Sequence, residues 1–339
     1  MLTMLSLAPK MSRAAPSVGR LARATPRVAP AYRLAPRLAR AALCEQPARE
    51  EPTHRSFHNT TARSVKRDPI QHSPAGLLPE FSLKDKVIVV SGGAQGLGIV
   101  QAEALLEAGA KVHVYDRQPE PGAGTKYEKV VKRAKELGTS ITYHQVDVLD
   151  GAAKLHQITE EIVAKDGHID GLIAAAGIQQ ETPALDYTAE DSNRMLGVNV
   201  TGCLMTAQAV AKHMYQNDTP GSIVLIASMS GTIANRGLIC PVYNASKAAV
   251  IQLGRNLAAE WGIKNIRVNT ISPGYIVTEM VQRLFEKFPD RAVEWPKQNM
   301  LNRLSKPEDY RGAAVFLLSD ASRFMTGADL RIDGGHAAW

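Results

Sequence analysis

Short apolar runs alternate with longer amphipathic segments from residue 86 to the end of the chain. Residues 87–90 and 223–227 are apolar at every position, which predicts strands buried on both faces, as in a parallel sheet covered by helices. Leu155, Ile158 and Ile162 recur at helical spacing and mark one face of a helix. The repeated strand–helix alternation predicts an α/β fold with one doubly wound parallel sheet of about seven strands and helices on both faces.

The same pattern places the individual elements. Strands are expected at residues 86–91, 111–115, 141–146, 172–175, 223–227, 266–271 and 329–332. Helices are expected from residue 98 to Gly109, before residue 141, around residues 155–163, at about 189–213, from Pro241 onward and at about 307–318. The segment from residue 275 to about 300 is expected to form a lid.

A glycine-rich stretch follows the first predicted strand. Residues 91–98 read Ser-Gly-Gly-Ala-Gln-Gly-Leu-Gly, and a helix, a second strand and Asp116 come next. Glycines permit a tight turn and let backbone N–H groups approach a pyrophosphate at the helix N-terminus. Asp116 lies eighteen residues after Gly98, where a carboxylate can accept hydrogen bonds from the ribose of a dinucleotide. This context predicts dinucleotide binding, and the alternative is a purely structural turn.

Ser228, Tyr243 and Lys247 are candidate catalytic residues. Ser228 stands at the end of the strand at 223–227, and Pro241 opens the following helix at a favoured position. Tyr243 and Lys247 are four residues apart and therefore share one helix face. A cation near a phenol favours the phenolate, so this tyrosine could act as a general acid or base near neutral pH. The Tyr-x-x-x-Lys spacing also arises by chance, so its weight depends on the other motifs.

Together these motifs resemble those of the short-chain dehydrogenase/reductase family over roughly residues 81–339. They match in order along the chain, which makes the resemblance specific. The matching motifs are the glycine motif at 91–98, with Ser91 where Thr is usual; Asn199 in Val-Asn-Val-Thr-Gly; Ser228, Tyr243 and Lys247; Pro273-Gly274 with Thr278; Arg303 with Pro307-Glu308-Asp309; and Thr326-Gly327 with Asp333-Gly334-Gly335. The resemblance implies a single Rossmann-type domain at 81–339.

The resemblance also implies hydride transfer between a nicotinamide cofactor and a carbinol carbon. Tyr243 would be the general acid or base, Lys247 would lower its pKa and bind the nicotinamide ribose, and Ser228 would orient the substrate oxygen. Asn199 would help to hold a water that relays the proton. The implied cofactor-binding set is Ser91, Gly92, Gly96, Leu97, Gly98, Asp116, Asp147, Val148, Ala175, Gly177, Tyr243, Lys247, Pro273, Gly274, Ile276 and Thr278. Family members are usually dimers or tetramers, so a homodimer or homotetramer is expected.

One motif departs from the family pattern. Ala174-Ala175-Ala176-Gly177 stands where Asn-Asn-Ala-Gly is usual. The absent amides would normally bond to neighbouring backbone, which puts local rigidity near the cofactor in doubt.

The spacing narrows the resemblance further. Ser228 and Tyr243 are fifteen residues apart, and residues 227–235 resemble the fungal polyol and ketose subgroup. This implies interconversion of a secondary alcohol of a polyol, such as D-arabinitol, and its ketose. The alternatives are a mitochondrial 3-oxoacyl carrier-protein reductase that uses NADPH, and an inactive cofactor-binding scaffold. By position alone, Gln179, Gln180, Asn235, Tyr275 and the lid are candidate pocket lining.

Asp116 predicts a preference for NAD over NADP. A carboxylate at this position would repel the 2′-phosphate of NADP. The neutral Gln95 supports NAD, since related NADP-preferring proteins often carry Arg or Lys just before the second glycine of the motif. Arg117 leaves the alternative open, because it could reach a 2′-phosphate if Asp116 turned away.

The positive charge of the chain is concentrated in its first 64 residues. This segment has eleven Lys or Arg against three Glu, whereas the remainder has 29 basic and 30 acidic residues, so the charge gives no argument for a nucleic-acid partner. Seven arginines from Arg13 to Arg40 are interleaved with Ala, Leu, Pro and Ser, and no acidic residue precedes Glu45, which is typical of a mitochondrial transit peptide. The alternative is a disordered basic tail.

Residues 55–64 resemble a two-step matrix-processing pattern, which implies cuts after Ser56 and after Ser64. The sequence therefore predicts a cleaved transit peptide at 1–64, a proline-containing linker at 65–80 and location in the mitochondrial matrix. Contact with the import and processing machinery would be transient.

The apolar runs, the cysteines and the histidines predict no further site. No run of eighteen apolar residues predicts a membrane span. Cys44, Cys203 and Cys240 lack Cys-x-x-Cys spacing, and the nine histidines form no His-x-x-x-His pair. Neither a disulfide framework nor a metal site is expected.

Overall fold

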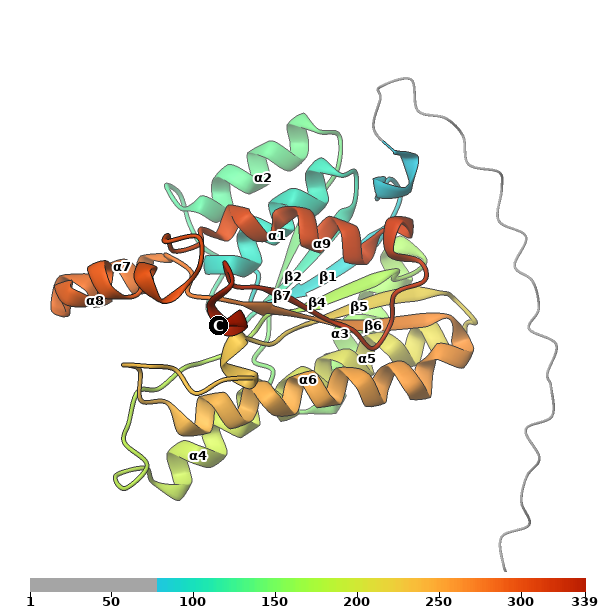
Figure 1. The fold of residues 1–339 in the computed structure, drawn as a ribbon. Helices are drawn as coiled ribbons and strands as arrows, with labels where there is room; N and C mark the ends of the chain where they lie inside the picture. Colours follow the sequence, from blue (N-terminus) through green and yellow to red (C-terminus); the bar gives the residue numbers. More distant parts are fainter. Residues whose placement is uncertain (1–77) are drawn as a thin grey trace, which may run out of the picture. The chain divides into compact units, whose positions relative to one another are not determined.

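The computed structural model describes residues 78–339, so the predicted transit peptide and residues 65–77 of the predicted linker lie outside this part. Within it, seven parallel strands form one sheet in the order β3-β2-β1-β4-β5-β6-β7 (Figure 1). The strands are β1 (Val87–Ser91), β2 (Lys111–Asp116), β3 (Ile141–Gln145), β4 (Gly171–Ala174), β5 (Gly221–Ile226), β6 (Ile266–Pro273) and β7 (Asp329–Ile332). The predicted fold class is confirmed.

Helices cover both faces of this sheet. In Figure 1, α1 (Gly96–Glu107), α2 (Lys126–Glu136) and α9 (Arg311–Leu318) lie on one face, and α3 (Ala152–Asp166), α5 (Cys203–Gln216) and α6 (Pro241–Trp261) lie on the other. Alternate residues of each central strand enter opposite apolar cores, so Val90 packs toward α1 and α9 while Val89 packs toward α3, α5 and α6. Full burial of one such side chain contributes about 1.5–3 kcal/mol, which explains why the central strands are apolar at consecutive positions.

The helix expected at about 189–213 is present and contains a π turn. α4 (Ala189–Leu196) passes into a π-helical turn, η2 (Gly197–Gly202), before α5 begins at Cys203. The chain is closely packed at this turn, because a Cβ at Gly202 would lie 2.6 Å from the Val148 side chain. The prediction of a long helix is therefore confirmed, and the π turn within it is a feature that the sequence pattern did not indicate. The turn carries Asn199, and π turns move side chains out of the regular helical register.

The carboxyl ends of the parallel strands meet at one edge of the sheet. Ser91, Asp116, Ala174 and Pro273 are the last residues of β1, β2, β4 and β6. The strand order reverses between β1 and β4, which are adjacent in the sheet. In open α/β sheets, ligands bind outside the carboxyl ends at such a point. The topology therefore places the candidate residues where a ligand site is expected.

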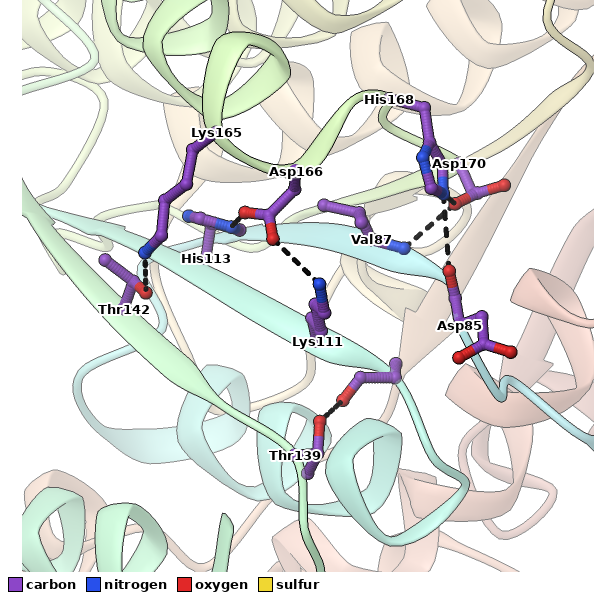
Figure 2. A network of polar contacts seen from close by, with 11 residues as sticks. Asp85, Val87, Lys111, His113, Thr139, Thr142, Lys165, Asp166, His168 and Asp170 are labelled. Carbon is purple, nitrogen blue, oxygen red and sulfur yellow. Dashed lines mark hydrogen bonds and ion pairs between the residues drawn. The ribbon is translucent and has the colours of Figure 1, made fainter. Parts of the chain in front are cut away.

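A buried polar network joins β2, β3 and α3 within the sheet–helix interface. His113 lies between Asp166 and His144, with its ring nitrogens 3.0 Å from a carboxylate oxygen of Asp166 and 2.9 Å from Nε2 of His144. Lys111 pairs with the other oxygen of Asp166 at 3.0 Å, and Figure 2 shows this carboxylate between the two β2 side chains. Burial lowers the pKa of His113, and burial lowers the pKa of His144 to about 4.

This network predicts that the protein loses stability as the pH falls. An ordinary histidine has a pKa of 6.5, so the unfolded chain takes up a proton at residue 144 at a higher pH than the folded protein does. Stability should decline from about pH 6.5 toward pH 4, and no such decline should occur above pH 7. The measurement is the urea midpoint at pH 7.5, 6 and 5. The decline should be smaller in His144→Gln.

Candidate active site

The first turn of α1 can approach an anion closely. Gly92 and Gly96 have φ values of 64° and 55°, and a Cβ at Gly98 would lie 2.2 Å from the Gly92 carbonyl oxygen. Only glycine fits these positions without strain. The N-cap residue Gln95 makes no side-chain cap hydrogen bond, whereas threonine side chains cap α2, α4 and α7 (Glu279–Lys287). The N–H groups of this turn are therefore available to a pyrophosphate.

Asp116 ends β2 beside the glycine-rich turn. Its carboxylate accepts hydrogen bonds from the backbone N–H of Ala94 at 3.2 Å and of Gln118 at 3.3 Å. Its side chain is buried, whereas Arg117 is exposed. These bonds hold the carboxylate next to the turn, where the sequence predicts contact with the adenosine ribose.

Hydrogen bonds connect the ends of β1 and β4 although alanines replace the usual asparagines. The Ala175 N–H donates to the Ser91 carbonyl oxygen at 3.1 Å, and the Ala176 N–H donates to the Ser91 hydroxyl at 3.3 Å. A Cβ at Gly92 would also lie 2.9 Å from Ala176, so the two backbones are in close contact. The Ser91 side chain and the backbone thus supply contacts that hold this edge together.

The remaining residues of the implied cofactor set lie at the same edge of the sheet. The structure places Leu97 in the first turn of α1, Asp147 and Val148 after β3, Ala175 and Gly177 after β4, and Pro273, Gly274, Ile276 and Thr278 at or after the end of β6. The Gly274 N–H donates to the Ile332 carbonyl oxygen at 2.9 Å, which ties the loop after β6 to β7. A Cβ at Gly274 would lie 2.8 Å from Cα of Asp333, so this contact requires glycine.

Ser228, Tyr243 and Lys247 lie next to one another. The Ser228 hydroxyl accepts a hydrogen bond from the Ser230 N–H at 3.1 Å and lies close enough to the Tyr243 hydroxyl to affect its pKa. Nζ of Lys247 lies 5.7 Å from the ring centre of Tyr243 and donates to the Ile226 carbonyl oxygen at 2.8 Å. The three side chains therefore form a single cluster at the end of β5 and the start of α6.

Burial dominates the electrostatics of this cluster. It raises the pKa of Tyr243 to about 12, although the nearby Ser228 hydroxyl opposes this shift. Burial also lowers the pKa of Lys247 to about 8. The net shift of the Tyr243 pKa is upward because removal of a phenolate from water costs more than the Ser228 hydroxyl returns. The expected lowering of this pKa by Lys247 stays a prediction.

Asn199 is buried in the π turn and fastens the segment after β4. Its side-chain oxygen accepts from the Ile178 N–H at 2.9 Å, and its Nδ2 donates to the Ile178 carbonyl oxygen at 3.0 Å and to the Ser246 hydroxyl at 2.9 Å. A Cβ at Gly177 would lie 3.4 Å from the Asn199 oxygen and 3.6 Å from Nζ of Lys247. Asn199 and Lys247 thus face the same glycine. Sequence reasoning missed Ser246, whose only signal is its place directly before Lys247.

A small apolar cluster lies beside Tyr243 and below the segment from α7 to α8 (Pro289–Glu294). It is built around Leu238, Cys240 and Trp295, and both Tyr243 and Tyr275 pack against it. The rings of Tyr275 and Trp295 stack with their centres 4.3 Å apart. The predicted lid segment therefore forms helices that bring an aromatic wall to the catalytic cluster.

Polar contacts connect the lid to the segment after β4. Arg291 of α8 makes two hydrogen bonds to the Glu181 carboxylate, at 2.8 and 2.6 Å. Gln179 lies close to the Cys240 thiol, while the Gln180 side chain donates to Thr182 and therefore has part of its hydrogen-bonding capacity already used.

Comparison with known proteins identifies the family. A family model described as Enoyl-(Acyl carrier protein) reductase matches residues 92–337. The short chain dehydrogenase/reductase notP′ of Aspergillus versicolor is 40% identical over 263 residues, which are 76% of this chain and 89% of that protein. The chain belongs to the short-chain dehydrogenase/reductase family.

Other members of the family support a relation to polyol dehydrogenases. D-arabinitol 2-dehydrogenase [ribulose-forming] of Candida albicans is 34% identical over 78% of this chain and 96% of that protein. NADP-dependent mannitol dehydrogenase of Hypocrea jecorina is 36% identical over 77% of this chain and 95% of that protein. These relatives confirm the resemblance to the fungal polyol subgroup.

The fold comparison agrees. A crystal structure of a short-chain type dehydrogenase/reductase from Mycobacterium marinum superposes with a TM-score of 0.70 at 34% identity, and it covers 76% of this chain and 98% of that one. This dehydrogenase is therefore an NAD(P)-dependent oxidoreductase that acts on CH–OH groups. No helix in residues 78–339 is long and apolar enough to cross a membrane, and no cluster of His, Cys, Asp or Glu in that range could hold a metal ion.

Proposed function

We propose that this dehydrogenase interconverts a secondary alcohol of a polyol and the corresponding ketose, with NAD as cofactor and a D-arabinitol-like substrate. The observation that carries the proposal is the cluster of Ser228, Tyr243 and Lys247, with Nζ of Lys247 5.7 Å from the Tyr243 ring centre, at the sheet edge where the predicted cofactor-binding residues also lie. The polyol substrates named for several relatives support the choice of substrate class.

The residues present fit a nicotinamide dinucleotide. The uncapped first turn of α1 would receive the pyrophosphate, Asp116 would accept from the adenosine ribose, and Lys247 would donate to the nicotinamide ribose. The loop from Gly274 to Thr278 would hold the nicotinamide end. When bound, the cofactor supplies the acceptor or donor of the hydride.

Tyr243 exchanges the proton in the proposed mechanism. Its raised pKa suits a general acid that keeps its proton until a ketone oxygen takes it. Alcohol oxidation needs the phenolate, so any further positive charge beside Lys247 would favour that direction. Ser228 would orient the substrate oxygen. Asn199 would hold the 177–178 backbone against Lys247; its part in a water relay stays a prediction.

A substrate and cofactor screen tests the proposal. Purified protein would be assayed with D-arabinitol, mannitol, xylitol, sorbitol and a short 3-oxoacyl thioester, each with NAD(H) and NADP(H). A polyol should give the highest kcat/KM, with NAD. Turnover confined to the thioester with NADPH would replace the proposal with the 3-oxoacyl carrier-protein reductase. Cofactor binding with no turnover of any substrate would indicate a scaffold.

We also propose that residues 1–64 direct the protein to the mitochondrial matrix. The support is the arginine-rich segment that lacks acidic residues before Glu45. N-terminal sequencing of protein from purified mitochondria should begin at or near Val65. Replacing the arginines from Arg13 to Arg40 with Gln should leave the protein in the cytosol. Intact Met1 on organellar protein, or a purely cytosolic wild type, would contradict this location.

A homodimer or homotetramer is proposed from the family resemblance, and light scattering of the purified protein measures it. A monomer at micromolar concentration would contradict it.

A further inference from the structure

A continuous chain of hydrogen bonds runs beside the catalytic cluster, from the start of α6 to the loop after β6. Nδ2 of Asn244 donates to the Ile233 carbonyl oxygen and to Oδ1 of Asn235, both at 2.9 Å. Nδ2 of Asn235 then donates to the Tyr275 hydroxyl at 3.2 Å. The Cys240 thiol donates to the side-chain oxygen of Asn244 at 3.1 Å. These contacts link residues 40 positions apart and end on a phenol.

The direction of every bond in this chain follows from its first member. A backbone carbonyl can only accept, so the group of Asn244 that meets Ile233 must be its NH₂. That NH₂ also meets Asn235, which must present its oxygen there and its own NH₂ to Tyr275. The Tyr275 hydroxyl is therefore an acceptor in this bond. Its own hydrogen finds no acceptor among residues 78–339 and remains available to a ligand.

Packing fixes where this hydroxyl lies. One face of the Tyr275 ring stacks on Trp295, and its edge meets His336 with ring centres 5.4 Å apart. Tyr275 packs against the same apolar cluster as Tyr243. Burial raises the pKa of Tyr275, so the phenol keeps its hydrogen at neutral pH. A rigid donor that packs on the same apolar cluster as the acid–base tyrosine can hydrogen-bond a second oxygen of the substrate.

We propose that Tyr275 is a specificity-determining residue, which donates a hydrogen bond to a hydroxyl of the substrate other than the one that reacts, and that Asn235 is its positioning residue. This proposal rests on the proposed function, because it requires a substrate with more than one hydroxyl. It explains how a largely apolar pocket wall could favour a polyol over a simple secondary alcohol.

Tyr275→Phe tests the proposal directly. The ring can still stack on Trp295, so the pocket wall is kept while the donor is removed. The kcat/KM for the preferred polyol should fall about tenfold, the scale of one lost neutral hydrogen bond, mainly through KM. The value for 2-pentanol or 2-pentanone, which has no second oxygen, should stay within about twofold of wild type. Tyr215→Phe is the matched control, because this tyrosine is 41% exposed on α5 and should change neither value.

Asn235→Asp tests whether Asn235 orients the Tyr275 hydroxyl or only packs against it. A carboxylate can still accept from Asn244 but can only accept from Tyr275, so it would take the hydrogen that the wild type offers to the substrate. This variant should lose as much polyol kcat/KM as Tyr275→Phe although the phenol is present. In the Tyr275→Phe background it should cause little further loss. A role of Asn235 in structure alone predicts additive losses and no difference between substrates.

The outcomes separate this proposal from the function on which it rests. Wild-type protein that turns over no polyol contradicts both. Wild-type protein that turns over polyols, with equal losses for polyol and 2-pentanol in Tyr275→Phe, or with no loss, overturns the role of Tyr275 alone.

Discussion

Replacing Tyr243 with Phe should lower turnover by a factor of about 10² or more, the scale of lost acid–base catalysis. The substitution removes the hydroxyl that lies near Ser228 and keeps the ring beside Lys247. Cofactor binding should therefore change little, which a fluorescence titration with NADH would measure. Steady-state kcat in both directions is the readout. Near wild-type activity would exclude Tyr243 as the acid–base residue.

The pH dependence adds a second check on the same residue. Burial raises the pKa of Tyr243 to about 12, so the phenolate fraction rises with pH throughout the neutral range. Alcohol oxidation should become faster from pH 6 to pH 9, whereas ketone reduction, which uses the protonated phenol, should not. The residual activity of Tyr243→Phe should lack this rise. Tyr215→Phe should keep the wild-type profile, because its ring lies far along α5 on the exposed surface.

The strands were the most predictable part of the fold. Residues 329–332 were expected as a strand and form β7, and residues 266–271 were expected and lie within β6. The central strands β1 and β5 are buried along almost their whole length, so their consecutive apolar residues follow directly from their environment. The π turn at Gly197–Gly202 was not predictable, because the helical pattern continues through it. Its interruption coincides with the close packing of Gly202 against Val148, a contact between distant parts of the sequence.

The candidate site likewise has features that the sequence predicts and features that it does not. The topology alone brings the ends of β1, β2, β4 and β6 to one edge, so motif residues that follow these strands could be placed together from the sequence. The shift of the Tyr243 pKa could not be predicted, because it depends on how much water the surrounding packing excludes. The Asn235–Tyr275 bond could not be predicted either, since neither residue belongs to a motif that requires the other.

Asp116→Ser should shift the cofactor preference of the protein from NAD toward NADP. The substitution removes a carboxylate that would accept from the adenosine ribose and would repel a 2′-phosphate. Loss of hydrogen bonds to a charged group, together with relief of this repulsion, should change the ratio of kcat/KM for the two cofactors by about 10²-fold. The same ratio in wild type should favour NAD. A wild-type protein that clearly prefers NADP(H) would contradict the role assigned to Asp116.

Two further variants separate charge from hydrogen bonding. Asp116→Asn keeps an oxygen that can accept from the Ala94 or Gln118 N–H but removes the negative charge. If repulsion decides the preference, Asn should shift the ratio nearly as far as Ser. Arg117 is exposed and adjacent, so it is the cation available to a 2′-phosphate once the acid is gone. Adding Arg117→Ala to Asp116→Ser should therefore lower kcat/KM for NADP and leave that for NAD nearly unchanged. Equal losses for both cofactors would show that Arg117 supports the loop and does not recognise the phosphate.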